Sequence, residues 1–434
     1  MNRRQFVSLC GSAGMGLAIP AALRSAEDAP SANHADPKPY SGPYYVVFNA
    51  SGGWDTTYLM DPKGVNGINR LYQSGEIVTE GNHKLAPNSK HIKAGMSNEA
   101  FFKKYAKELL VLNGLDYSVN NHDPCARYMA TGKLDSLAYP TFAALVAACK
   151  GAKYPLAFLT FGNYSATGNL VPMARIPYLQ SLNLIANSDG VHGNDRSPYH
   201  DAFVSDRIEK ALEKSHRDEA SLPRLPRLER GESMLYAAQL NSKSLKWVTP
   251  YIPKTVAKER LSQQADIALA AFKGGVCVSA NLSIGQFDSH NNNDADQMKL
   301  IPEMLAGVDY LLRRAEELKI REQIVVIMQS EMGRTPQYNN GNGKDHWSIG
   351  SAMFLGKGIK GNRVIGATDD KQFLLPLDAQ TLKTLKTDDK SGMRVRPEHL
   401  HAALRSFAGI DSHPFAKQFP FEFPKSEMLA GLWG

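Results

Sequence analysis

Cysteine is scarce in this 434-residue chain, and its scarcity limits the kind of protein the chain can form. There are four cysteines, and Cys10 lies in an N-terminal segment that we expect to be removed. The other three, Cys125, Cys149 and Cys277, are an odd number and form no Cys-x-x-Cys pair. At most one disulfide can form, which excludes a disulfide-stapled scaffold.

The chain also lacks internal repeats and any basic cluster interleaved with aromatic residues. Hydrophobic residues make up 43% and charged residues 21%, a balance typical of globular proteins and not of disordered or multispanning membrane proteins. The formal net charge is +7, and Arg3, Arg4 and Arg24 contribute three of these charges, so +4 remains without residues 1–26. We therefore expect no nucleic-acid partner.

Residues 1–26 contain no acidic residue and predict an export signal. The order Asn-Arg-Arg-Gln-Phe at residues 2–6 precedes an apolar, small-residue run from Val7 to Leu23. This order is typical of a twin-arginine signal, whose passengers fold before export and can acquire metal in the cytoplasm. We therefore expect the twin-arginine export machinery as a partner, a periplasmic or secreted location and no stable membrane span after processing. A general-secretory signal or an uncleaved anchor is the alternative, because Arg24 disturbs a small-x-small cleavage site ending at Ala26.

After a linker at residues 27–43, the sequence predicts one α/β domain over residues 44–434. Short buried strands are expected at residues 44–49, 109–112, 157–161, 276–280, 324–328 and 352–355, and helices at residues 125–130, 261–272, 298–318 and 397–407. Residues 207–247 are dense in Lys, Arg and Glu and predict a helical insertion at about 200–250. The alternation of strands and helices predicts a mostly parallel sheet with helices on both faces.

Acidic and imidazole side chains follow three of the predicted strands. The run Ile-Val-Val-Ile-Met at residues 324–328 is soon followed by Glu331, residues 276–280 lead to Asp288 and His290, and residues 44–49 lead through two glycines to Asp55. Ligands of open α/β proteins bind at the carboxyl edge of the sheet. Carboxylates and imidazoles that converge there are the ligand mixture for zinc, manganese or iron.

Each of these residues also has a structural interpretation. Asp55 could cap a helix that begins at Thr56, and Glu331 could pair with Arg334 in place of a metal. Asp288 and His290 could belong to a solvated Asn- and Asp-rich loop. An EF-hand is excluded there, because Asn and Lys stand where the loop needs glycine and glutamate.

Two further segments carry candidate residues. His122 and Asp123 precede Pro124, which suits the first turn of a helix, so one of them lies at its positive end. The alternative is that Asp123 caps the helix while His122 is exposed. Asp345 and His346 lie in a glycine-rich loop before a strand, where Asp345 could ligate a metal, could orient His346, or could form an ordinary surface pair with it.

In order, these motifs resemble those of a known family. The set is Gly-Gly-Trp-Asp at residues 52–55, Asn-His-Asp at 121–123 with Thr-Gly-Lys at 131–133, Phe-Asp-Ser-His at 287–290, Ser-Glu-Met-Gly-Arg-Thr at 330–335, Asp-His-Trp at 345–347 and Leu-His-Ala-Ala-Leu at 400–404. With the twin-arginine signal, this order resembles the domain of unknown function 1501 family, which is grouped with the alkaline phosphatase and sulfatase superfamily. The resemblance covers nearly everything from Tyr44 onward.

The resemblance implies an alkaline phosphatase-like fold and two divalent metal ions. It implies that Asp55, His122 and Glu331 surround one ion and that Asp288, His290 and His346 surround the other, roughly 3.5–4 Å away. The chain departs from the superfamily where sulfatases carry the cysteine that becomes formylglycine, because His122 stands there. Cys125 does not restore that motif, and Met332 replaces a metal-binding histidine.

These departures disfavour a formylglycine sulfatase and weaken a typical phosphatase. His122 is then a ligand, a phosphohistidine-type nucleophile or a base for a metal-bound water. We expect a secreted, metal-dependent hydrolase-like protein that acts on a small-molecule or polysaccharide ester of phosphate or sulfate with metal-activated water. Arg127 or Arg334 could bind the anionic group. The alternative is a catalytically degenerate periplasmic or surface-associated binding protein that retains the fold.

Overall fold

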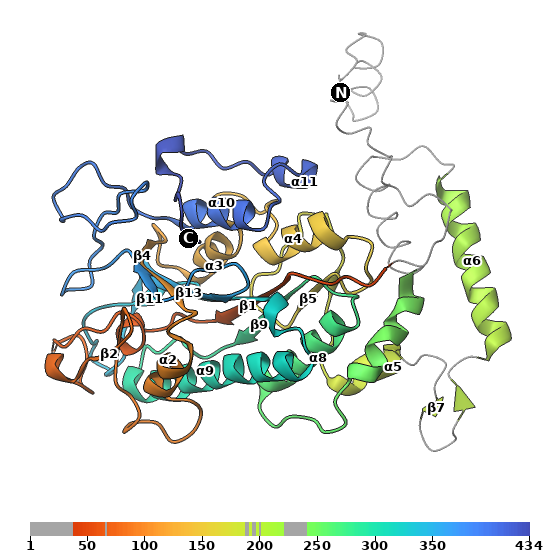
Figure 1. Ribbon diagram of the computed structural model, residues 1–434, viewed down its shortest axis with the longest axis horizontal. Helices are drawn as coiled ribbons and strands as arrows, with labels where there is room; N and C mark the ends of the chain where they lie inside the picture. Colours follow the sequence, from red (N-terminus) through yellow and green to blue (C-terminus); the bar gives the residue numbers. More distant parts are fainter. Residues whose placement is uncertain (1–37, 66, 187–190, 193–196, 199–200, 221–240) are drawn as a thin grey trace, which may run out of the picture. The chain divides into compact units, whose positions relative to one another are not determined.

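The computed structural model describes residues 38–434 except 66, 187–190, 193–196, 199–200 and 221–240, and is built on one eight-stranded sheet (Figure 1). The strand order is β14-β4-β13-β10-β1-β9-β5-β6. The strands are β1 Tyr44–Ala50, β4 Leu110–Asp116, β5 Phe158–Thr160, β6 Met173–Ala174, β9 Ser279–Ile284, β10 Ile324–Ser330, β13 Ile349–Gly356 and β14 Arg363–Ile365.

All strands of this sheet run the same way except β13. It is antiparallel to both of its neighbours, β10 and β4, whereas β1 pairs in parallel with β10 on one side and β9 on the other. The carboxyl ends of β10, β1 and β9 therefore meet at one edge. This confirms the predicted mostly parallel sheet.

Helices cover both faces of the sheet because its central strands are apolar on both sides. In β1, Tyr44, Val46 and Phe48 pack into one core cluster, whereas Tyr45 and Val47 pack into the other. The first core includes residues of α2 Asn98–Tyr105, α8 Arg260–Lys273 and α9 Asn293–Glu317. The second includes residues of α3 His122–Thr131, α4 Phe142–Gly151 and α10 Pro397–Phe407, on the opposite side of the sheet in Figure 1. The prediction of helices on both faces is confirmed.

Several boundaries differ from the expected ones. The strand expected at 276–280 begins later, at Ser279, because Val276 still donates its amide to the carbonyl of Ala271 at the end of α8. β4 continues through Asp116, beyond the expected end at residue 112, because its pairing with β13 extends to Asp116. The helix expected from Cys125 begins at His122.

The remaining elements are short or peripheral. They are η3 Thr56–Tyr58, η4 Ser74–Glu76, β2 Val78–Glu80, β3 His83–Leu85, α5 Leu179–Ala186, β7 Val191–His192, β8 Ser197–Pro198, α6 Ala202–Ala220, η5 Asn241–Tyr251, η6 Arg321–Gln323, β11 Gly333–Arg334, β12 His346–Trp347, α11 Pro414–Lys417 and η7 Lys425–Glu427. α6 and η5 lie in the predicted helical insertion, whose middle falls outside the described residues.

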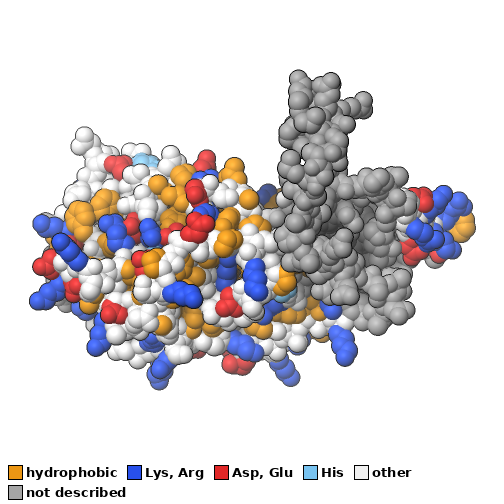
Figure 2. Space-filling view, turned by 90° about the horizontal axis from the view of Figure 1, so that it is seen from above, with side chains coloured by type: hydrophobic (Ala, Val, Ile, Leu, Met, Phe, Trp, Pro, Cys, Tyr) orange, Lys and Arg blue, Asp and Glu red, His pale blue; other side chains and the backbone are white. Residues whose placement is uncertain are grey.

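The predicted signal segment at residues 1–26, and most of the linker, also lie outside the described residues. Among the residues that are described, no helix has the length and apolar character needed to cross a membrane. In the view of Figure 2, the described basic side chains are dispersed among acidic and apolar ones.

Candidate metal centre

The candidate site lies at the carboxyl edge formed by β10, β1 and β9. Ala50 at the end of β1 is in register with Ser330 of β10 and Ile284 of β9, so the segments that follow these strands leave the sheet side by side. Gly52 has φ +116°, and a Cβ there would lie 2.5 Å from the backbone nitrogen of Asp288. The glycine after β1 thus allows the backbone of that loop to approach the loop that carries Asp288.

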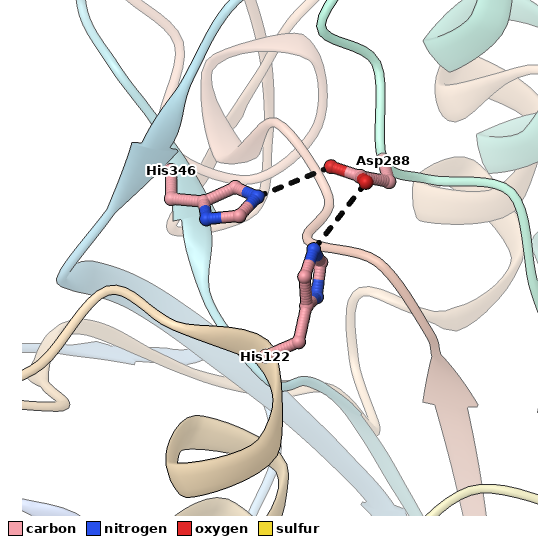
Figure 3. A group of neighbouring side chains, drawn as sticks. All are labelled: His122, Asp288 and His346. Atoms are coloured by element: carbon pink, nitrogen blue, oxygen red, sulfur yellow. Dashed lines mark hydrogen bonds and ion pairs between the residues drawn. The ribbon is translucent and has the colours of Figure 1, made fainter.

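Asp288 is the centre of this arrangement. Its Oδ2 lies 3.3 Å from Nε2 of His122, and its Oδ1 lies 3.1 Å from Nε2 of His290 and 3.2 Å from Nε2 of His346. His122 comes from the start of α3 and His346 from β12, and Figure 3 shows both rings directed toward the carboxylate. Residues from three distant parts of the sequence therefore meet at one side chain.

Each of these imidazoles is held at Nδ1 by an acceptor. Nδ1 of His122 lies 2.6 Å from Oε1 of Glu331, Nδ1 of His290 lies 2.8 Å from Oδ1 of Asp345, and Nδ1 of His346 lies 2.9 Å from the carbonyl of Asn120. A carboxylate or a carbonyl only accepts, so Nδ1 is the donor in each ring. A neutral ring then presents the lone pair of Nε2, and all three lone pairs face Asp288.

Converging acceptors of this kind suit a bound cation. One ligand atom each of His122, Asp288 and His346 lies within 4.8 Å of the other two, and Nε2 of His290 lies 3.0 Å from Nε2 of His346. In a tetrahedron with bonds of about 2.0–2.1 Å, neighbouring ligand atoms are roughly 3.3–3.4 Å apart. Histidines whose second nitrogen is held by a carboxylate or carbonyl are typical of metal sites. These residues fit a divalent transition metal.

Arg334 supplies the fixed positive charge of the site. Its Nη2 lies 2.7 Å from Oδ1 of Asp288, and the side chain is fully buried. Burial raises the pKa of Asp288, but the hydrogen bond and charge of Arg334 outweigh it and lower this pKa to about 2. Burial lowers the pKa of His346 below its usual value, which favours the neutral imidazole that a metal needs. Asp288 and His346 are thus in the right protonation states for ligands at neutral pH.

The geometry gives Arg334 a different role from the predicted binding of the anionic group of a substrate. Its guanidinium also donates to the carbonyls of Gly52, Gly53 and Lys344, and none of its surface is exposed. Arg334, the alternative partner considered for Glu331, forms its ion pair with Asp288 instead. Arg334 therefore holds Asp288 and the loop after β1 in place and has no surface left for a substrate.

Asp55 lies apart from the histidines, and its partner was not foreseen. Its Oδ2 lies 2.7 Å from Nζ of Lys344, and both side chains are fully buried. Asp55 also caps η3 through the amide of Thr57, as the alternative interpretation expected. Lys344 carries no signal in the sequence beyond its place in a glycine-rich loop. An ion between Asp55, His122 and Glu331 stays a prediction that this geometry does not favour.

A cleft of about 700 Å³ opens beside His122. Nε of Arg127 donates to the carbonyl of Leu134 at 2.8 Å, and no ion pair joins Arg127 to an acidic residue in the described part of the chain. The cleft is lined by Ser51, His122, Asp123, Ala126, Arg127, Leu137, Phe161, Gly162, Asn163, Tyr164, Arg260, Ser283, Gly285 and Glu331. Of the two arginines predicted to bind the anionic group, Arg127 lines the cleft beside the candidate centre, whereas Arg334 is buried.

Cys125 is not equipped to act as a nucleophile. It is buried, and its thiol donates to the carbonyl of Val119 at 3.2 Å. Burial raises its pKa to about 12, so the thiolate is not formed at neutral pH. This agrees with the expectation that Cys125 does not replace the missing formylglycine cysteine.

Residues 227–419 match the model of a family described as "Protein of unknown function (DUF1501)", which confirms the resemblance to that family over these residues. No curated protein sequence matches the chain significantly. A sulfatase from Pseudoalteromonas sp. is similar in structure, with 11% identity, coverage of 90% of this chain and 73% of that chain, and a TM-score of 0.38. A phosphonate monoester hydrolase from Silicibacter pomeroyi has 9% identity, coverage of 88% and 78%, and a TM-score of 0.30. Similarities this low carry no argument about substrate or chemistry.

Proposed function

We propose that this chain, which carries the DUF1501 family region over residues 227–419, is an exported metal-dependent hydrolase of phosphate or sulfate esters. The observation that carries the proposal is the convergence of three Nε2 lone pairs on the ionised Asp288 at the carboxyl edge of the sheet. A divalent ion bound there would lower the pKa of water and polarise the ester. Zinc, manganese and iron all accept this set of imidazole and carboxylate ligands.

The residues around the centre divide into ligands and residues that orient them. His122, Asp288 and His346 would hold the ion, and His290 lies within reach of the same position. Glu331 and Asp345 would orient His122 and His290 through Nδ1, which also makes these rings more basic. The centre remains open to solvent on one side, because the side chains of Asp288 and His122 are 43% and 34% exposed.

The cleft beside His122 supports an anionic substrate. Nε of Arg127 donates to the carbonyl of Leu134, so the Nη atoms of its guanidinium can bind the anionic ester group in the cleft. Arg260, at the start of α8, lines the same cleft and forms no ion pair with an acidic residue in the described ranges. Asp123 and Glu331 also line the cleft, so its charge is mixed and not strongly basic.

The cleft extends away from the metal centre, which supports the polysaccharide form of the substrate. A second cleft of about 390 Å³ shares Phe161 and Arg260 with the first and continues to Arg175 and to Tyr178, a residue that is 63% exposed. Aromatic rings stack on the apolar faces of sugars, and arginines bind their anionic groups. A chain of anionic sugars would place one ester at the metal centre and further units along Arg260 and Arg175.

The binding-protein alternative is favoured by one observation. His122 stands where the resemblance expects a nucleophile, and its Nε2 faces Asp288 and the proposed ion. A chain that holds a metal and an anion without turnover would present the same geometry. The predicted twin-arginine-type signal is compatible with both functions and would export a protein that has already bound its metal.

The test is metal analysis of the full chain after folding in the cytoplasm, followed by assays on phosphate monoesters, phosphate diesters and sulfate esters. We expect bound metal and turnover of at least one ester class, loss of turnover with a chelator and recovery on addition of Zn²⁺, Mn²⁺ or Fe²⁺. His122→Ala should lower turnover by orders of magnitude, whereas His91→Ala, at an exposed position outside the centre, should not change it. Tight metal binding without turnover of any ester would favour the binding protein instead.

A further inference from the structure

We infer that the buried ammonium group of Lys344 takes the place of a second metal ion, so that the centre holds one ion and not two. The inference rests on the proposed metal centre and concerns the part of the implied two-ion arrangement that these residues do not fit. Asp55 is the side chain on which a second ion would depend, and its surroundings carry the argument.

The carboxylate of Asp55 has no coordination site left for a metal. Oδ1 accepts from the amide and the hydroxyl of Thr57 at 3.1 and 2.6 Å. Oδ2 accepts from Nδ2 of Asn293 at 3.0 Å and from Nζ of Lys344 at 2.7 Å. A carboxylate offers about four lone-pair sites, and here protein donors take all of them.

The side chain of Lys344 is a buried cation inside the fold and not a surface charge. Its side chain has no exposed surface, and Nζ lies 5.5 Å from the ring centre of Tyr58 and 5.1 Å from that of Tyr338. The hydroxyls of both tyrosines donate to Oδ1 of Asp294, at 2.8 and 2.6 Å. The two aromatic rings and the carboxylate of Asp55 all attract the ammonium group, so Asp55 has its counter-charge already.

The backbone of Lys344 is bound to the same loops that carry the metal ligands. Its amide donates to the carbonyl of Ser289 at 3.0 Å, and its carbonyl accepts from Nη1 of Arg334 at 3.1 Å. A Cβ at Gly343 would lie 1.9 Å from the backbone of His290, so only glycine permits this approach. Insertion of Lys344 beside Asp55 therefore also fixes Asp345 and His346, the next two residues, against the loop of Asp288.

Charge balance around the centre agrees with one ion. Arg334 compensates Asp288, and Lys344 compensates Asp55. Glu331 and Asp345 each hold the Nδ1 of a histidine, and their charges remain for a single divalent ion to balance. In this arrangement Lys344 is a positioning residue that supplies a fixed charge without contact to the substrate.

The experiment is elemental analysis of the full-length chain after equilibration with excess Zn²⁺ and removal of free metal. We expect one Zn²⁺ per chain, and one Mn²⁺ per chain with the six-line EPR spectrum of an isolated ion. Two Mn²⁺ ions roughly 3.5–4 Å apart would couple magnetically and alter that spectrum. Two ions per chain would overturn the inference alone, whereas no bound ion would overturn the proposed function and this inference with it.

Variants distinguish whether Asp55 is a metal ligand or only the ion-pair partner of Lys344. The pair Asp55→Asn with Lys344→Met removes both charges together and avoids an uncompensated buried charge. We expect this double variant to keep one Zn²⁺ per chain, and His346→Ala to lose it at the same free Zn²⁺ concentration. Loss of the ion from the folded double variant would show that Asp55 is a ligand and would overturn the inference. If the double variant does not fold, the stoichiometry and EPR spectrum of the wild-type chain decide the question.

Discussion

Nδ1 of His122 lies 2.6 Å from Oε1 of Glu331. Glu331, which directly follows β10, therefore orients the imidazole of His122 at the start of α3. Glu331 is buried, with 7% of its side chain exposed, and His122 is the more exposed partner at 34%. The carboxylate of Glu331 thus binds Nδ1 on the buried side of the imidazole, and Nε2 on the other side faces Asp288. This relationship gives Glu331 the role of an orienting residue.

The first prediction concerns this pair. Glu331→Gln keeps the shape and an acceptor but removes the charge that makes His122 a better ligand. We expect the Zn²⁺ affinity to fall about 10- to 100-fold, with a matching loss of ester turnover at limiting Zn²⁺. A competition titration with a chromophoric chelator measures this affinity. Glu398→Gln is the control, because Glu398 accepts from Tyr128 at 3.0 Å outside the centre and should bind Zn²⁺ as wild type does. An unchanged affinity in Glu331→Gln would contradict the role given to Glu331.

The second prediction concerns Arg260, which lines both clefts and forms no ion pair with an acidic residue in the ranges that the structure describes. If the substrate is a chain of anionic sugars, Arg260→Gln should raise KM about tenfold for the oligomer and leave KM for a small ester nearly unchanged. The difference should shrink in high salt, because exposed charges are screened.

The matched control for Arg260 is Lys258→Gln, an exposed cation two residues earlier that does not line either cleft. Steady-state kinetics on oligomers of increasing length measure both variants. Equal KM values for long and short substrates in Arg260→Gln would show that the second cleft does not bind substrate.

The sequence predicts the sheet edge well because strand ends can be located from residue type. The apolar run of β10 stops in polar residues at a definite point, and its parallel neighbours β1 and β9 end in register with it. His122 and His346 were also recognisable, since each lies beside a glycine-rich or proline-marked segment. Asp288, His290 and His346 do lie together, although Asp288 and His346 are 58 positions apart, and Glu331 joins them through His122.

The sequence does not predict which donor binds each carboxylate. Asp55, Asp288 and Glu331 all follow strands, yet Asp55 receives Lys344, Asp288 receives Arg334 and Glu331 receives His122. These pairings depend on the direction in which a side chain leaves the backbone, which a strand-end pattern does not specify. Lys344 shows this limit most clearly, because a lysine in a glycine-rich loop would be expected in solvent.

The third prediction concerns the ion pair of Asp55 and Lys344, whose side chains are both fully buried. Lys344→Met alone leaves a buried carboxylate without its cation and should lower the free energy of unfolding by about 3–5 kcal/mol. The double variant with Asp55→Asn should lose less than the sum of the single variants, which is the signature of a direct coupling.

Urea unfolding of the metal-free chain measures these free energies and separates them from metal binding. The control is Lys210→Met, which breaks an exposed pair with Asp206 at 2.8 Å and should leave the free energy of unfolding nearly unchanged. Additive losses for Asp55→Asn and Lys344→Met would show that the two side chains do not stabilise each other.

The last prediction concerns acid stability through His399 and His401 of α10. Burial lowers the pKa of His399 to about 4 and that of His401 to about 3. His401 places Nε2 2.8 Å from the carbonyl of Met129 and so joins α10 to α3, the helix that begins at His122. Because the folded pKa lies below the unfolded value of about 6.5, the unfolded chain takes up the proton first as the pH falls. Each imidazole should therefore lower the free energy of unfolding by about 1.4 kcal/mol per pH unit below roughly pH 6 and have no effect above pH 7.

His401→Asn should flatten this dependence between about pH 6 and pH 4 in urea unfolding curves, whereas His91→Asn, at an exposed position, should retain the wild-type slope. An unchanged slope in His401→Asn would mean that His401 is not kept neutral by the fold.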